Sequence, residues 1–206
     1  MAIEILERPV APAAHPVVPD YPLGAGWRKV MMWTFIITDG LLFAGFLASY
    51  GYARLSASRW PAQHDVFSLG YLAAMTFVLI SSSATMASAV EAARLNQWKA
   101  VVRFTLLTLA GGTVFLGMQA YEWAHVIGEG ATLVHNPWGD PAFGSYFFLL
   151  TGFHGSHVLT GLIVLGSTAV RSSRRRSSAE GVEMAGLYWH FVDLVWVFIF
   201  TLFYLV

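Results

Sequence analysis

The sequence predicts an all-α integral membrane protein, a bundle of five transmembrane helices. Of its 206 residues, 56% are hydrophobic and only 12% are charged, whereas about 25% of the residues of a soluble protein are charged. Five apolar runs are each long enough to cross a bilayer, which takes about 20 helical residues. These runs are continuous rather than alternating, and an open sheet edge has no hydrogen-bond partners in lipid, so strands are excluded.

Each span shows the features of a membrane helix, and none contains a proline. The first is interrupted only by Asp39, and the fifth only by Asp193. In the second, Ser81, Thr85 and Ala89 repeat every four residues, which predicts a face of small side chains that lets helices approach closely. We place the spans at residues 29–52, 67–91, 100–124, 145–170 and 186–206.

The third and fourth spans carry polar and small residues for contacts within the bundle. The third ends in a polar group that includes Gln119, Tyr121 and Glu122. The fourth is rich in glycine, which again suits close helix packing. These glycines are Gly152, Gly155, Gly161 and Gly166.

The chain divides into a tail and one membrane domain. Residues 1–26 hold five of the eight prolines and no apolar run of signal-peptide length, so we interpret them as a proline-rich cytoplasmic tail. Residues 27–206 form the five-helix domain, with no internal repeat.

Lysine and arginine positions predict the orientation of the helices. With a cytoplasmic tail, the outer side holds only Arg54 and Arg59, and we expect the C-terminus there. The cytoplasmic side then holds ten basic residues: Arg8, Arg28, Lys29, Arg94, Lys99, Arg103, Arg171, Arg174, Arg175 and Arg176. We expect the chain to lie in a bacterial inner membrane. The last three arginines are orientation signals or contacts to anionic lipid headgroups.

Composition also excludes several kinds of function. The chain has no cysteine, which excludes disulfides, iron–sulfur clusters and the binuclear copper site that needs two thiolates. Its formal net charge is zero, so nothing points to a nucleic-acid partner.

Two aspartates lie inside predicted spans, where an unpaired charge costs roughly 3 kcal/mol or more. Asp39 either ties two helices together by a hydrogen bond or faces a proton route or lipid-filled cleft. Asp193 lies three residues after His190, on the same helix face, and we expect the two to pair directly.

His154 and His157 share one face of the fourth span. Glu122 and His125 form a Glu-x-x-His motif, but a di-iron site needs two such motifs and further carboxylates. We therefore expect no metal here. Instead, we expect the two histidines to hydrogen-bond to the end of the third span, near Gln119 and Glu122.

Four blocks of sequence, in order along the chain, resemble subunit III of the haem–copper respiratory oxidases in its short five-helix form. The resemblance runs from about Trp33 to the C-terminus. The last two blocks are the most specific. The blocks are FIITDGLLF (residues 35–43), QAYEW (119–123), TGFHGSHV (151–158) and WHFVDLVW (189–196).

The resemblance implies an accessory subunit that has no catalytic residue, haem or copper of its own. In that family, subunit I carries haems and copper and reduces oxygen to water while pumping protons. Subunit III packs on subunit I, holds phospholipids and sustains proton uptake, so subunit I, subunit II, further respiratory subunits and structural phospholipid are the implied partners. Many members have glutamate at the position of Asp39, which puts any role that depends on the longer side chain in question.

Other functions remain open. Within the family, the electron donor is cytochrome c or quinol, and the second and third blocks look more like the cytochrome c branch. A related accessory protein of nitric oxide reductase is a further alternative. Outside the family, the rivals are a free-standing membrane di-iron oxygenase and a proton-coupled transporter that uses Asp39 and Asp193.

Overall fold

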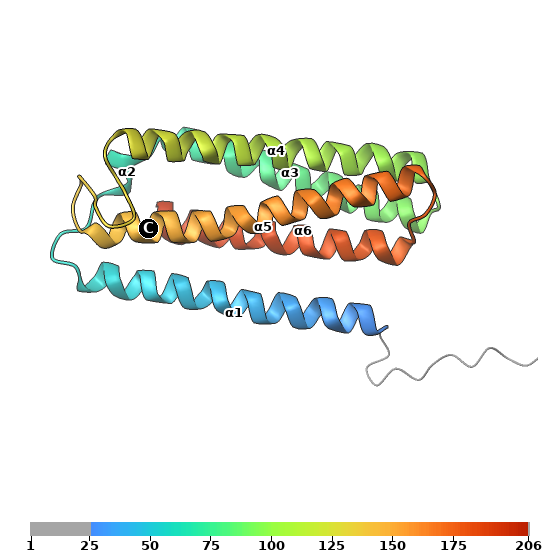
Figure 1. Ribbon diagram of the computed structural model, residues 1–206, viewed down its shortest axis with the longest axis horizontal. Coiled ribbons are helices and arrows are strands. Elements are labelled where there is room, and N and C mark those ends of the chain that lie inside the picture. The colour runs from blue at the N-terminus through green and yellow to red at the C-terminus, as the bar shows by residue number, and fades with distance from the viewer. Residues whose placement is uncertain (1–25, 206) are drawn as a thin grey trace, which may run out of the picture.

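The computed structural model describes residues 26–205 (Figure 1). In this range the chain is helical and has no β-strand, and five helices are long and apolar enough to cross a membrane. The predicted all-α membrane bundle is therefore confirmed. The predicted tail falls almost wholly outside the described residues, as does Val206. The helices are α1 (Trp27–Ser56), α2 (Gln63–Val66), α3 (Leu69–Arg94), α4 (Trp98–Gly128), α5 (Pro141–Ser173) and α6 (Ala179–Ile199), followed by the π-helical segment η1 (Phe200–Leu205).

The last span begins at Ala179, well before the predicted residue 186. Its first turns are polar, and the Ser178 side chain caps them by accepting a hydrogen bond from the Gly181 N–H at 3.1 Å. Glu183 lies 2.9 Å from Lys29 on α1 and 3.7 Å from Arg94 on α3. These ion pairs keep a charged turn helical at the end of the bundle, where an apolar pattern gives no signal.

Helices α3, α4, α5 and α6 form the body of the bundle, each packed against two of the others. Helix α1 lies outside them and contacts only α5 and α6 extensively, as Figure 1 shows. Only Phe43 and Tyr50 of α1 are buried. Most of the α1 surface is therefore not covered by the rest of the described chain.

Two tryptophans of α6 fill the centre of the bundle. Trp189 donates from Nε1 to Ser82 Oγ at 3.0 Å, and Trp196 donates to Thr76 Oγ1 at 3.0 Å, so both indoles bridge to α3. Glycines on the neighbouring helices make room for the Trp189 ring. A Cβ on Gly161 would lie 2.9 Å from that ring, and one on Gly112 would clash with it directly.

Of the three residues predicted for the small-residue face of α3, Thr85 and Ala89 lie on the contact face and Ser81 does not. Ser81 is exposed, and Ser82 makes the close approach to α4, where a Cβ on Gly111 would lie 2.8 Å from the Ser82 Cβ. Thr85 lies on this face as predicted, with its Oγ1 2.8 Å from Thr108 Oγ1. The four-residue repeat identified the right helix and most of its contact face, which also includes Ser82 and Met86.

Candidate functional site

Asp39 of α1 contacts His157 of α5, with Oδ2 and Nε2 3.3 Å apart and both side chains largely buried. This is ion-pair distance, although Asp39 Oδ2 makes no well-aligned hydrogen bond. The other ring nitrogen, His157 Nδ1, lies 2.9 Å from the Phe153 carbonyl oxygen. Asp39 thus contacts a neighbouring helix, but through a close polar contact and not through the hydrogen bond that one of its two interpretations named.

A pair of Asp39 and His157 without net charge would hold one proton between them. The Phe153 carbonyl can only accept, so His157 Nδ1 carries a proton. If His157 is neutral, its bare Nε2 faces Asp39 Oδ2, and the two lone pairs repel unless the carboxyl is protonated. If His157 is cationic, the pair is an ion pair. Its net charge is zero in both cases, which is the inexpensive state in a membrane.

Glu122 of α4 is the centre of a second buried cluster, near the opposite end of the bundle from Arg174. Its Oε2 accepts hydrogen bonds from Gln119 Nε2 and from Tyr204 OH, each at 3.0 Å. The cluster ties the last turns of α4 to η1. Sequence analysis identified Gln119 and Glu122 but missed Tyr204, because a tyrosine in a terminal apolar run looks like an interface aromatic.

His154 does not join this cluster, so the predicted hydrogen bond to the end of the third span is wrong. Its side chain is 1% exposed, and neither ring nitrogen has a hydrogen-bond partner among residues 26–205. The ring lies 5.9 Å from that of Phe115 on α4 and 5.3 Å from that of Trp196 on α6. His154 therefore packs as an aromatic side chain, while His157 faces α1.

The predicted pair of His190 and Asp193 is also wrong. His190 Nδ1 instead contacts Ser83 Oγ on α3. Asp193 is buried, and neither of its carboxyl oxygens has a hydrogen-bond partner among the described residues. A partner on the facing helix lies closer to His190 than the carboxyl one turn further along its own helix.

No group of three or more histidine, aspartate or glutamate residues in the range 26–205 is arranged to hold a metal ion. His154 and His157 contact different helices, and His125 lies 3.3 Å from Glu129 rather than joining Glu122.

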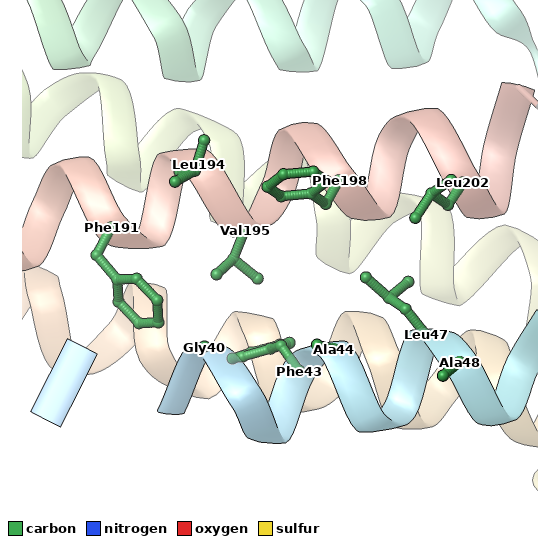
Figure 2. A pocket seen from close by; sticks show the side chains of 10 residues that line it. All are labelled: Gly40, Phe43, Ala44, Leu47, Ala48, Phe191, Leu194, Val195, Phe198 and Leu202. Carbon is green, nitrogen blue, oxygen red and sulfur yellow. The ribbon is translucent and has the colours of Figure 1, made fainter. Parts of the chain in front are cut away.

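An apolar groove of about 430 Å³ runs between α1 and α6, as Figure 2 shows. One wall begins at Gly40, directly after Asp39, and the other contains Leu194, Phe198 and Leu202, which are exposed. Every lining residue is apolar: Gly40, Phe43, Ala44, Leu47, Ala48, Phe191, Leu194, Val195, Phe198 and Leu202. The groove suits a hydrocarbon chain, and the Asp39–His157 pair lies close to it.

The three arginines after α5 lie at the end of the bundle where α4 begins (Figure 1). Arg174, Arg175 and Arg176 are exposed, and none of them makes an ion pair with a residue in the described part of the chain. They are available to a ligand or to a charged surface.

Comparison with known proteins agrees with this architecture. The family model for cytochrome c oxidase subunit III matches residues 22–206. The cytochrome c oxidase subunit 3 of Alkalihalophilus pseudofirmus is 36% identical over 195 residues, covering 91% of this chain and 93% of the relative. The quinol oxidase subunit 3 of Bacillus spizizenii is 33% identical over 190 residues, covering 90% and 91%. The cytochrome c oxidase subunit 3 of Thermostichus vulcanus is 32% identical over 183 residues, covering 87% of each chain.

The family match spans all five membrane helices and all four sequence blocks. The chain therefore belongs to the subunit III family of the haem–copper oxidases.

Proposed function

We propose that this chain is an accessory subunit of a proton-pumping terminal oxidase in aerobic electron transport and performs no redox chemistry itself. The chain belongs to the subunit III family, and one observation within it carries the proposal. The buried polar groups of Asp39 and Glu122 contact other helical segments of the same bundle. They stabilise the packing of the bundle instead of converging on a shared centre. The divergence of His154 and His157 likewise argues against a free-standing di-iron oxygenase.

The partners follow from this role. Subunit I, with subunit II and further respiratory subunits, would supply the haem and copper. The exposed apolar surface of α1 supports docking in the membrane. After the subunits are separated, this chain should carry no stoichiometric haem, copper or iron, and a haem spectrum that stays with it would refute the proposal.

We favour cytochrome c as the electron donor of the complex, on the QAYEW and TGFH blocks at residues 119–123 and 151–154. Relatives of similar identity carry cytochrome c oxidase and quinol oxidase names. The alternative is therefore a quinol oxidase of the same superfamily. Oxygen uptake by the purified complex with reduced cytochrome c, compared with a quinol, separates the two.

The proposed orientation places the N-terminus in the cytoplasm and the C-terminus on the outer face of the bacterial inner membrane. Lys29, Arg94 and Arg174 all lie at one end of the bundle, which supports a cytoplasmic end there. A reporter fused after Val206 should be active only outside the cytoplasm. Activity inside the cytoplasm would reverse the topology.

The groove between α1 and α6 is the proposed site of an acyl chain of a structural phospholipid. Ala44→Trp should fill the groove and remove about one bound phospholipid per complex, because the indole occupies the space of the chain. Leu41→Trp is the matched control, since Leu41 lies on the same helix, is exposed and does not line the groove. Equal lipid content in Ala44→Trp and wild type, counted by phosphorus analysis, would exclude the site.

Asp39 is proposed to hold α1 against α5 rather than to supply protons to subunit I. In Asp39→Asn the amide can donate to the bare Nε2 of neutral His157, so the contact survives without the shared proton. Turnover should stay near wild type across the pH range. A loss of turnover that deepens as pH rises, with the subunit still bound at normal stoichiometry, would assign Asp39 to proton uptake instead.

A further inference from the structure

A second pocket, of about 340 Å³, opens where α4 begins and α5 ends. It is lined by Trp98, Lys99, Val102, Ser172, Ser173 and Arg175. It shares no lining residue with the groove between α1 and α6. We call it the phosphate pocket. It lies at the end of the bundle that carries the arginine cluster.

The charges around the phosphate pocket have one sign. Lys99 and Arg175 line it, no carboxylate does, and neither cation makes an ion pair with a residue in the range 26–205. Two neighbouring cations without a counter-charge favour an anionic ligand.

The start of α4 adds backbone donors to the same place. Its N-cap residue, Gln97, makes no side-chain cap, and the first turn has no acidic residue. The N–H groups of Lys99 and Ala100 have no backbone acceptor among the described residues. Free N–H groups at the positive end of a long helix bind anions readily.

Ser172 provides an independent observation that points to a ligand. This residue lines the phosphate pocket and is 1% exposed, yet its hydroxyl has no hydrogen-bond partner among the described residues. Elsewhere on α5, Ser167, Thr168 and Ser173 each donate to a carbonyl one turn earlier. A buried hydroxyl without a partner is costly, and a ligand in this pocket would supply the acceptor that Ser172 does not have among the described residues.

We propose that this pocket binds the phosphate group of an anionic phospholipid. Lys99, Arg175, the Ser172 hydroxyl and the free N–H groups of α4 together offer donors and positive charge to the phosphate oxygens. Leu106 lies one turn after Val102 on α4 and is exposed, so it can contact an acyl chain. Trp98 is an aromatic residue of the kind that anchors at the headgroup level. The site depends on membrane insertion of this chain, but not on the electron donor or on any contact with subunit I.

The test uses the full-length chain, in the complex with which it purifies, stripped of lipid in detergent and titrated with phosphatidylglycerol under native mass spectrometry. Lys99→Gln combined with Arg175→Gln should weaken the tightest binding step by about tenfold or more, because both charge-assisted contacts are lost. Arg103→Gln combined with Arg174→Gln removes the same charge outside the phosphate pocket and should change binding by less than about twofold.

Ser172→Ala tests the same pocket independently, in case the charge variants do not fold. It removes a hydroxyl that has no partner in the described part of the chain, so ligand-free stability should not fall, whereas binding should weaken by roughly fivefold. Loss of binding in the pocket variants alone supports the site. Equal weakening in the Arg103/Arg174 control, binding of phosphatidylcholine as tight as that of phosphatidylglycerol, or displacement of the lipid by equimolar inorganic phosphate would each overturn it. So would unchanged binding in Ser172→Ala.

Discussion

Trp189→Ala should lower the free energy of unfolding of the bundle by about 3–5 kcal/mol, the range found for large aromatic side chains removed from packed interiors. Trp189 is fully buried and contacts α3 through its hydrogen bond to Ser82. Its ring also lies against Gly112 of α4 and Gly161 of α5, so one side chain joins four helices. Unfolding in a denaturing detergent, followed by circular dichroism, measures the change.

Two controls make the Trp189 result specific. Trp27→Ala changes a tryptophan that is 68% exposed and should cost less than about 0.5 kcal/mol. Gly161→Ala should destabilise the wild-type protein but be tolerated in the Trp189→Ala background, where the cavity accepts the new methyl group. Additive effects of Gly161→Ala and Trp189→Ala would contradict the contact.

Gly144→Ala should cost about 1–3 kcal/mol because the new methyl group meets backbone that cannot rotate away. A Cβ on Gly144 would lie 2.7 Å from the Thr132 carbonyl oxygen and 3.3 Å from that of His135. Both carbonyls belong to the loop that connects α4 to α5. The same detergent unfolding experiment measures the loss, and protease sensitivity of the loop should rise with it.

Gly117→Ala is the matched control for Gly144→Ala. Gly117 is also inside a helix, but a Cβ there meets nothing within 4 Å. Alanine should therefore stabilise the helix by up to about 1 kcal/mol. If the two substitutions shift stability in the same direction, the close packing of the loop on Gly144 is wrong.

The helices could be predicted from the sequence because lipid imposes a simple rule of length and polarity. The rule does not apply to segments that lie outside the lipid bilayer. It missed the first turns of α6, which Lys29 and Arg94 stabilise through Glu183, and it missed α2 in a loop. Neither feature has an apolar pattern.

The candidate site was predictable residue by residue, but its contacts were not. Asp39, Glu122 and His190 could be identified because they are polar residues within predicted membrane spans. Their partners His157, Tyr204 and Ser83 lie on other helical segments. Pairing rules for residues on one helix say nothing about how neighbouring helices are rotated. Gly112 was missed for the same reason, since its role appears only once Trp189 is opposite it.

Purification of the chain from its native membrane by an affinity tag, in mild detergent, tests the assignment as an accessory oxidase subunit most directly. The tagged chain should bring down the haem- and copper-bearing subunits in equal stoichiometry, with the haem absorption spectrum and oxygen uptake in the same fraction. Recovery of the chain alone, or with partners that contain no haem and reduce no oxygen, would contradict the assignment.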